Sequence, residues 1–216
     1  MPRSPEEWDA WSAGAGEAEA PPGGPAADAA VRDALAAIPG RWTKTVGDLG
    51  CGGGRLLPYL CGAFGQVIAV DFAPATLARA RCACAGLPVV FRRRDLRDLT
   101  PLRNRLDVAV LVDALAGPRA SDVDRVLRQV AASLVHGGVL VGTFRARPRQ
   151  GKDPVPLPLG DAPVTAGPDG LPAFHETELQ YRLRCAGFRG LRLRRVRGQE
   201  GAPDALAVVG RVQADN

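Results

Sequence analysis

Between residues 43 and 144, short apolar runs alternate with segments of helical periodicity, and this alternation constrains the fold more than any other feature of the sequence. Apolar runs that are each followed by a helical pattern predict parallel strands joined by crossover helices. The predicted strands are residues 43–49, 66–71, 89–94, 106–112 and 139–144, and the predicted helices are residues 27–38, 55–64, 74–85, 121–135 and 177–186.

Two further apolar runs, 191–196 and 205–212, follow the last helix without a helix between them, so they can pair antiparallel. Pro101 leaves room for only a very short helix before the fourth strand, and Pro58 must lie in the first turn of its helix. Gly137-Gly138 is expected to end helix 121–135. The predicted fold class is therefore α/β, a doubly wound seven-stranded sheet that is mostly parallel, with an antiparallel last strand and helices on both faces.

The length and composition of the chain predict one domain with an arm before it. The 216 residues suffice for one core, and the apolar and charged fractions, 46% and 24%, are typical of soluble proteins. Residues 1–26 are expected to form a flexible arm or lid, in which Trp8 and Trp11 either close over a ligand or pack on the first helix. Residues 27–216 would form the domain, in which residues 145–174, with seven prolines, are expected to be a long loop.

The apolar runs and the cysteine spacing address location and metal binding. No apolar run approaches the length of a membrane span, and the first residues lack the apolar core of a secretory signal, so we expect a cytoplasmic protein without a membrane partner. The five cysteines contain no Cys-x-x-Cys pair, and His136 and His175 are the only histidines. Reduced thiols and no metal site are therefore expected.

The net charge of +5 is carried almost entirely by arginine. Two clusters, Arg92–Arg94 and Arg189–Arg197, could meet a nucleic acid or an anionic substrate. Aromatic residues that could stack on bases are scarce around both clusters. The favoured interpretation is a solvated strand face in each case, with nucleic acid as a less favoured partner.

A glycine-rich turn, Asp48-Leu-Gly50-Cys-Gly52-Gly-Gly54, directly follows the first predicted strand. Doubly wound sheets bind ligands beyond the carboxyl ends of their strands, and glycine lets the backbone approach a ligand closely. The spacing G-x-G-x-G does not fit the dinucleotide pattern G-x-G-x-x-G, and no Gly-Lys-Ser/Thr follows, as a phosphate-binding loop requires. The turn therefore predicts a nucleotide-type ligand of another kind.

Two acidic residues flank this turn. Asp48 lies two residues before the first glycine, where its carboxylate would repel a pyrophosphate but would suit a ligand with an ammonium and a sulfonium group. Asp71 ends the second predicted strand, where a carboxylate can accept hydrogen bonds from both ribose hydroxyls. S-Adenosyl-L-methionine carries all of these groups, so the pattern favours it as the cofactor.

From about residue 27 to residue 212, the chain resembles the class I S-adenosylmethionine-dependent methyltransferases. The order and spacing of six segments carry the resemblance, and these segments are Val46–Gly54, Val70–Pro74, Arg94–Leu96, Leu106–Val112, Leu134–Leu140 and Glu178–Phe188. The resemblance implies an enzyme with the Rossmann-like methyltransferase sheet. It also implies a role in cofactor binding for Asp48, Gly50, Cys51, Gly52, Gly54, Asp71, Phe72, Asp95, Leu96 and Val112.

In this family, the residue matching Asp71 binds ribose and the residue after it packs on adenine, while Asp95 would meet the adenine amino group and Leu96 the ring. Asp98 and Asp107 are alternative acids for the position of Asp95. Cys51 is expected to line the site with its backbone alone.

The acceptor side of the site is less well defined by the sequence. A general base is needed only where the nucleophile must lose a proton, and the candidates are Asp113, after the fourth strand, and His175. The family's amide-methylating motif, Asn/Asp-Pro-Pro-Tyr/Phe, is absent, and Val112-Asp113-Ala114-Leu115 stands in its place. These features favour a small-molecule acceptor with an oxygen, nitrogen or carbon nucleophile.

Three other functions stay open at the level of sequence. An RNA or protein methyltransferase would use the arginine clusters, and its activity toward RNA would fall steeply with added salt. A non-catalytic regulatory protein would bind the cofactor without forming a methylated product. A dehydrogenase, the most distant alternative, would bind NADH more tightly than S-adenosylhomocysteine.

Overall fold

The computed structural model describes residues 4, 6, 7, 24–115, 120–148, 172–198 and 203–213. The strands are β1 (Thr45–Leu49), β2 (Gln66–Asp71), β3 (Val89–Arg93), β4 (Leu106–Val112), β5 (Leu134–Arg145), β6 (Phe188–Val196) and β7 (Ala205–Val212). The helices are α2 (Gly24–Ala36), α3 (Leu57–Ala63), α4 (Pro74–Ala83), α5 (Ala120–Ser133) and α6 (Glu176–Cys185), with the 3₁₀ turns η1 (Arg41–Thr43) and η2 (Thr100–Leu102).

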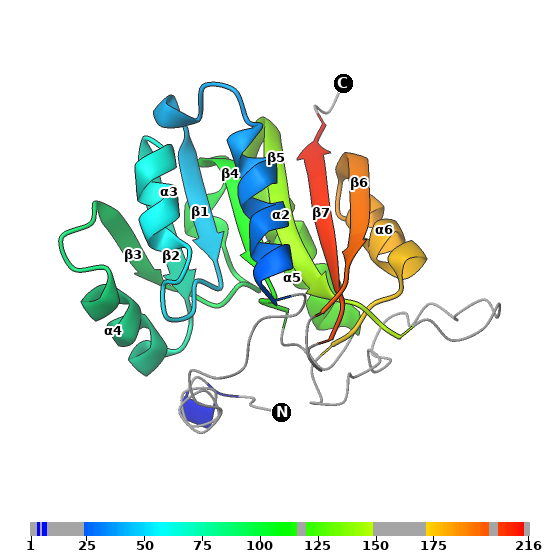
Figure 1. Cartoon of the computed structure of the whole chain (residues 1–216), viewed down its shortest axis with the longest axis horizontal. Coiled ribbons are helices and arrows are strands. Elements are labelled where there is room, and N and C mark those ends of the chain that lie inside the picture. Colours follow the sequence, from blue (N-terminus) through cyan, green and yellow to red (C-terminus); the bar gives the residue numbers. More distant parts are fainter. Residues whose placement is uncertain are drawn as a thin grey trace.

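All seven strands form one sheet in the order β3-β2-β1-β4-β5-β7-β6 (Figure 1). The neighbours from β3 to β5 are parallel, and β7 runs antiparallel to both β5 and β6. The doubly wound sheet with its antiparallel last strand is therefore confirmed. The strand order reverses between β1 and β4, so the carboxyl ends of these strands lie at the topological switch point, where such sheets bind ligands.

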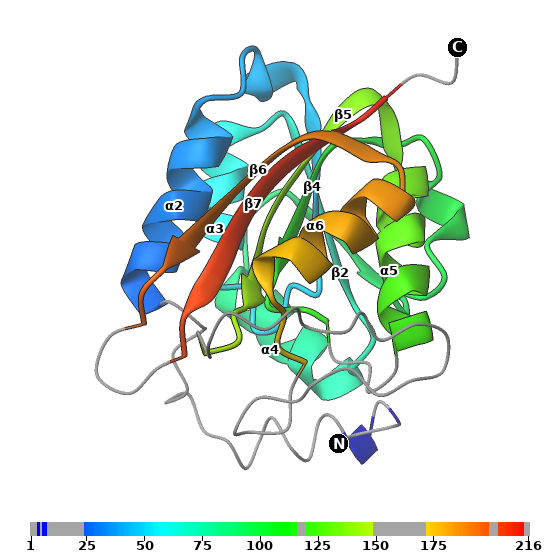
Figure 2. The same cartoon turned by 90° about the vertical axis from the view of Figure 1, so that its right-hand side faces the viewer.

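Helices cover both faces of the sheet. Figure 2 shows α2 and α3 on one side of the sheet and α5 and α6 on the other. Along β4, Val108 and Val110 pack in the core beneath α2, α3 and α4, whereas Ala109 and Leu111 pack in the core beneath α5 and α6. Successive side chains of a strand point to opposite faces, so a strand covered on both faces becomes a continuous apolar run. This is the pattern that predicts the central strands from the sequence.

The longest helix on the second face, α5, shows why its sequence is helical. Val123, Val126, Leu127 and Val130 are buried and recur at the three- and four-residue spacing of one helical face. The polar residues between them face solvent, so the helix can cover β4 and β5 without leaving polar groups in the core.

The connection from α5 to β5 differs from the sequence-based expectation. α5 ends at Ser133 and β5 begins at Leu134, so Gly137 and Gly138 lie inside β5, and the expectation that they end the helix is wrong. Leu134 is buried and pairs with Leu106, whereas the next pair is Val108 with Val139, so the register shifts between them. Gly137, with φ 72°, accommodates this irregularity in the strand.

Other boundaries move by a few residues. α2 begins at Gly24 and β6 at Phe188, both three residues earlier than predicted, while Pro58 lies in the first turn of α3 as expected. η2 is the very short helix expected before β4. Trp8, Trp11 and most of the long loop, residues 149–171, lie outside the described residues. No helix in the described ranges is long and apolar enough to span a membrane.

Candidate functional site

The glycine turn follows β1 at the switch point of the sheet. The backbone N–H groups of Gly50 and Cys51 both donate to the carbonyl of Val70, at 2.8 and 3.0 Å, and this fixes the turn against the end of β2. Gly50, Gly52 and Gly54 have φ values of 81°, 53° and 87°. These left-handed values favour glycine, which explains the spacing of the three residues.

The three glycines differ in what surrounds them. A Cβ atom on Gly50 would lie 2.4 Å from the Cβ of Ala114, and one on Gly54 would lie 3.1 Å from the Sγ of Cys84. These two glycines therefore allow the turn to pack against the segment after β4 and against α4. A Cβ atom on Gly52 would meet nothing within 4 Å. Gly52 thus presents its backbone to open space, where a ligand can approach it closely.

Asp71 lies directly beside this turn. Its Oδ2 accepts a hydrogen bond from the N–H of Gly52 at 2.9 Å, and its Oδ1 accepts one from the N–H of Ala73 at 3.0 Å. The carboxylate is buried at the end of β2. The structure therefore brings together Asp71 and Gly52 of the turn, two features that the sequence predicts for one ligand.

Asp48 is buried in β1 behind the turn. Desolvation by burial and the negative charge of Asp71 raise the pKa of Asp48 from its ordinary value of 3.8 to about 7. Both causes oppose ionisation, so a cationic ligand group near Asp48 would stabilise its carboxylate. This charge arrangement suits an ammonium or sulfonium group and disfavours a phosphate.

Leu96 and Asp95, predicted for the adenine side, lie in the segment after β3. The Cδ1 atom of Leu96 lies 3.7 Å from the position of a Cβ on Gly50, so Leu96 reaches the glycine turn. Both carboxylate oxygens of Asp95 accept hydrogen bonds from Nε of Arg97, at 3.1 and 3.0 Å. A ligand amino group at Asp95 would therefore share the carboxylate with Arg97. Phe72, half-buried, directly follows Asp71.

The two alternative acids have structural roles elsewhere. Asp98 accepts a hydrogen bond from the N–H of Thr100 at 3.2 Å and so stabilises the start of η2. Asp107 lies at the amino end of β4, where it accepts a hydrogen bond from the N–H of Thr45 at 2.9 Å. The glycine turn lies at the carboxyl ends of the parallel strands, whereas Asp107 lies at their amino ends.

Cys51 and Val112 complete the set of predicted cofactor-binding residues. Burial, followed by the charges of Asp48 and Asp71, raises the pKa of the Cys51 thiol, which therefore stays neutral and is a poor nucleophile. Val112 is half-buried at the carboxyl end of β4, where it pairs with Thr143 of β5.

Asp113 directly follows β4 in an unusual backbone conformation. Its φ is 50°, which is rare for a residue other than glycine, and its N–H donates to the carbonyl of Thr143 at 3.0 Å. Its Oδ2 accepts a hydrogen bond from a terminal nitrogen of Arg145 at 3.3 Å. The side chain of Arg145 is 6% exposed and that of Asp113 is 24% exposed. Strained residues of this kind cluster at functional sites.

A second ion pair lies close to the ion pair of Asp113 and Arg145. Arg55, directly after the glycine turn, forms an ion pair with Asp28 of α2. Burial lowers the pKa of Arg55, and the negative charge of Asp113 acts in the opposite direction, so Asp113 lies within electrostatic range of Arg55. Asp28, Arg55, Asp113 and Arg145 thus form an alternating set of charges, which we name the acceptor-side cluster.

Sequence reasoning found only one member of the acceptor-side cluster, Asp113. A usable signal was present for Arg145, because an arginine at the carboxyl end of an otherwise apolar strand is rarely buried without a partner. For Asp28 and Arg55, 27 residues apart in the chain, no local pattern indicates the contact.

His175, the other candidate base, is the N-cap residue of α6. Its Nδ1 accepts a hydrogen bond from the N–H of Thr177 at 3.4 Å and lies 2.8 Å from the Thr177 hydroxyl. Capping satisfies a free N–H at the start of the helix and is a sufficient reason for a polar side chain at this position.

The two arginine clusters lie far apart. β3 carries the first cluster and β6 the second, and these strands are the two edges of the sheet. Within the second cluster, the guanidinium of Arg195 forms ion pairs with the carboxylates of Glu176 at 3.3 Å and Asp204 at 3.1 Å. The clusters therefore do not form one continuous basic surface of the kind that a nucleic acid would follow.

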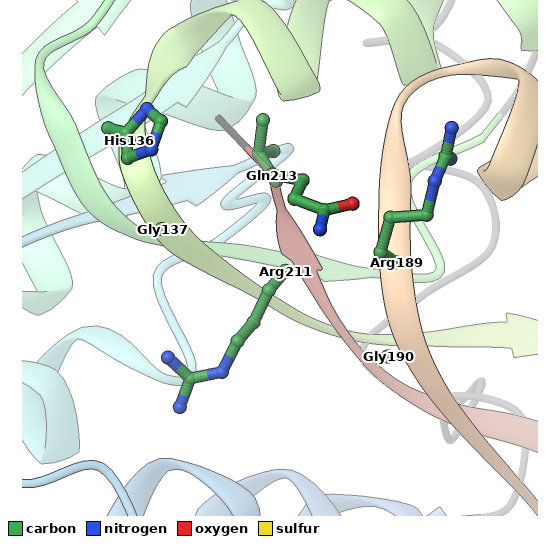
Figure 3. Close-up of a pocket in the computed structure, with 7 residues that line it drawn as sticks. His136, Gly137, Arg189, Gly190, Arg211 and Gln213 are labelled. Atoms are coloured by element: carbon green, nitrogen blue, oxygen red, sulfur yellow. The ribbon is translucent and has the colours of Figure 1, made fainter. Parts of the chain in front are cut away.

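A surface hollow of about 370 Å³ lies between β5, β6 and β7, away from the glycine turn. Figure 3 shows that the side chains of Arg189 and Arg211 extend away from one another there. The hollow adjoins the start of β5 and so lies at the end of the sheet opposite the carboxyl ends of the parallel strands. It is lined by His136, Gly137, Arg189, Gly190, Arg211, Val212 and Gln213.

Comparison with known proteins bears on the domain type and the fold. Residues 46–138 match a family model described as a methyltransferase domain. A search of curated sequences gives no significant match.

The fold is similar to that of several solved structures. One is the 1,6-didemethyltoxoflavin-N1-methyltransferase of Burkholderia thailandensis, with 23% identity and a TM-score of 0.68 over 96% of this chain and 84% of that one. Another is the N-methyltransferase NodS of Bradyrhizobium japonicum, with 15% identity and a TM-score of 0.66 over 87% and 86%. A third is the [4+2]-cyclase SpnF, with 20% identity and a TM-score of 0.70 over 86% and 81%.

At these identities the structural likeness establishes the fold, and the family model adds the methyltransferase domain that contains the glycine turn, Asp48 and Asp71. Residues 46–138 therefore match a methyltransferase domain, and the chain has the fold of methyltransferases of known structure.

Proposed function

We propose that the enzyme transfers the methyl group of S-adenosyl-L-methionine to a small-molecule acceptor at the carboxyl ends of β1, β2 and β4. The observation that carries this proposal is the pair of buried acids, Asp48 and Asp71, of which Asp71 accepts a hydrogen bond from the N–H of the open Gly52. Two acids beside a backbone that a ligand can approach closely suit a ligand that has both cationic groups and ribose hydroxyls.

Asp71 is our candidate for the residue that binds ribose. Its two carboxylate oxygens accept hydrogen bonds from the N–H groups of Gly52 and Ala73, and these bonds hold the carboxylate beside the glycine turn. We assign cofactor binding to Asp48, Gly50, Cys51, Gly52, Gly54, Asp71, Phe72, Asp95, Leu96 and Val112.

A small acceptor is favoured over a nucleic acid because the arginine clusters lie at opposite edges of the sheet. Two structures with the same fold bear names of small-molecule or N-methyltransferases, which is compatible with this choice. Asp113 is our candidate for the group that contacts the acceptor, because it follows β4 beside the donor site.

We further propose a cytoplasmic location and a domain of residues 27–216 preceded by an arm or lid of residues 1–26. The free state of all five cysteines is compatible with a reducing compartment.

Calorimetry with S-adenosylmethionine and S-adenosylhomocysteine tests the donor site through two matched glycines. Gly52 and Gly40 have similar φ values, 53° and 61°, and neither has an atom within 4 Å of a built Cβ. Gly52→Val and Gly40→Val therefore carry the same backbone strain, but only Gly52 faces the proposed site. We expect about 30-fold weaker binding for Gly52→Val and unchanged binding for Gly40→Val, since overpacking costs about 1–3 kcal/mol. Equal affinities in the two variants would contradict the assignment.

Turnover separates the enzyme from a cofactor-binding regulator. Incubation with methyl-labelled cofactor and a cell extract should label a small molecule, which mass spectrometry then identifies. Label in RNA that is lost steeply with added salt would instead indicate an RNA methyltransferase. Tight cofactor binding without any labelled product would indicate a regulatory protein.

A further inference from the structure

Within the acceptor-side cluster, a buried arginine stands behind the carboxylate that an acceptor would meet first. The Asp113 side chain is 24% exposed and the Arg145 side chain only 6% exposed, and 3.3 Å separate the bonded oxygen and nitrogen. A molecule that enters at the carboxyl end of β4 therefore meets the carboxylate, while the guanidinium contacts it from the protein side.

Both members of this pair are held by backbone hydrogen bonds. Arg145 pairs with Ala205 of β7, and its carbonyl accepts a hydrogen bond from the N–H of Phe174 at 2.9 Å. Asp113 is fixed by the bond from its N–H to Thr143 and by its left-handed φ of 50°. The position of the carboxylate is therefore set by two neighbouring strands, and a mobile loop does not determine it.

Two arginines place positive charge near Asp113. Arg145 contacts it from β5, and Arg55, which is paired with Asp28, acts on it from the end of the glycine turn. A nearby cation stabilises a carboxylate, and a carboxylate is the form that can accept a proton. An acceptor group that brings an O–H or N–H to Asp113 would thus find a hydrogen-bond acceptor already in place.

Resting on the proposed function, we propose that Arg145 is a positioning residue that fixes the Asp113 carboxylate as the proton acceptor for an O–H or N–H nucleophile. In the transfer, the lone pair of the oxygen or nitrogen forms a bond to the methyl carbon. The carbon–sulfur bond breaks, and its electron pair goes to sulfur. The proton of the nucleophile passes to Asp113, which later returns it to water. The site would therefore methylate hydroxyl, amino or azole groups.

Three variants separate this role from a general loss of stability. Arg145→Met removes the charge, Arg145→Lys keeps it, and Arg182→Met is the matched control. Arg182 is also buried, and it pairs with Glu178 at 3.1 Å and with Asp124 at 2.6 Å, but it lies on α6 on the opposite face of the sheet from α2. Should Arg145→Met fail to fold, Arg145→Gln removes the charge and keeps a hydrogen-bond donor.

The first measurement needs neither cofactor nor acceptor. In protein labelled with ¹³C at the aspartate carboxyl carbon, NMR follows the signal of Asp113, assigned with Asp113→Asn, as the pH is lowered. We expect the midpoint of this titration to rise by about one pH unit or more in Arg145→Met, and to stay near the wild-type value in Arg145→Lys and Arg182→Met. An unchanged midpoint in Arg145→Met would overturn the proposal, whatever the outcome of the cofactor-binding experiment.

The second measurement uses defined probe acceptors, namely a phenol, a primary amine, an imidazole and an enamine as carbon nucleophile, with S-adenosylhomocysteine release as the readout. With the O–H or N–H probe that turns over, kcat should fall at least about tenfold in Arg145→Met, with partial recovery in Arg145→Lys and an unchanged KM for the cofactor. Turnover of the carbon nucleophile alone, or equal kcat in all variants, would contradict the role of Arg145.

Discussion

The two sides of the proposed site differ in how their charges are arranged. The donor side contains Asp48 and Asp71, and the acceptor side contains the acceptor-side cluster. On the donor side, Asp48 and Asp71 are both buried, and desolvation by burial, together with the negative charge of Asp71, raises the pKa of Asp48 to about 7. On the acceptor side, two acids and two arginines alternate, so each carboxylate has a cationic neighbour within the protein. We therefore expect the donor side to bind a cationic group of its ligand and the acceptor side to orient a nearly neutral group.

The largest effect on stability is expected at the contact between Gly50 of the glycine turn and Ala114 after β4. Because a Cβ on Gly50 would lie 2.4 Å from the Cβ of Ala114 and the φ of Gly50 is 81°, Gly50→Ala combines a clash with backbone strain. We expect the free energy of unfolding, measured in urea, to fall by about 3 kcal/mol.

The double variant Gly50→Ala/Ala114→Gly separates the two causes, because it removes the clash but leaves the strain. It should recover about half of the lost free energy, after correction for Ala114→Gly alone. A double variant no more stable than Gly50→Ala would show that contact between the two sides is not what requires glycine here.

The next effect concerns cofactor affinity. Asp71→Asn keeps an oxygen for one of the two backbone N–H groups but removes the charge and half of the acceptor sites that ribose needs. We expect binding of S-adenosylhomocysteine to weaken by about 10- to 100-fold in calorimetry, since hydrogen bonds to charged groups contribute about 1.5–3 kcal/mol. Asp107→Asn is the matched control, because the Asp107 carboxylate also accepts a hydrogen bond from a backbone N–H but lies at the amino ends of the parallel strands, away from the glycine turn. Equal losses in both variants would contradict a ribose contact at Asp71.

Asp48 should make cofactor binding depend on pH. With a pKa of about 7 in the free site, roughly one tenth of the Asp48 carboxyl groups are ionised at pH 6. We therefore expect S-adenosylmethionine to bind about tenfold more weakly at pH 6 than at pH 8, whereas Asp48→Asn should bind equally at both. Parallel pH profiles for the two proteins would show that no cationic group contacts Asp48.

The same shift affects the stability of the ligand-free protein. Because the pKa of Asp48 is higher in the folded than in the unfolded chain, the folded state binds the extra proton between about pH 4 and pH 7, and stability falls as pH rises through this window. Without ligand, Asp48→Asn should thus have a higher Tm than wild type at pH 8, and the difference should shrink toward pH 5.

The smallest effect is expected at the outer pair of the acceptor-side cluster. The side chains of Arg55 and Asp28 are 43% and 21% exposed, and solvent screens such pairs. A double-mutant cycle with Asp28→Asn and Arg55→Gln should give a coupling free energy below about 1 kcal/mol in urea unfolding. A larger coupling would mean that α2 is anchored to the glycine turn mainly through this contact.

The sequence predicts the central strands and the glycine turn well because their signals are local. Strands buried on both faces become apolar runs, and left-handed backbone in a tight turn requires glycine at Gly50, Gly52 and Gly54. β1 and β2 are parallel neighbours whose carboxyl ends lie together, so Asp71 at the end of β2 lies next to the turn that follows β1. Each of these relations connects a spacing in the chain with a position in the fold.

The acceptor side depends on contacts that no local spacing encodes. Asp113 and Arg145 are 32 residues apart and meet only because β4 and β5 are neighbours with a particular register. The Gly137-Gly138 pair misleads for a related reason. It has the usual composition of a helix end, but the pairing of Leu134 with Leu106 draws these residues into the strand.

The placement of arginine on the edge strands has a consequence for how the protein behaves in solution. Arg92 and Arg93 of β3 and Arg192 and Arg194 of β6 are exposed at the two ends of the sheet. A strand from another molecule that paired with either edge would bring its backbone against these guanidinium groups and displace their water. We therefore expect both edge strands to resist the intermolecular pairing that leads to aggregation.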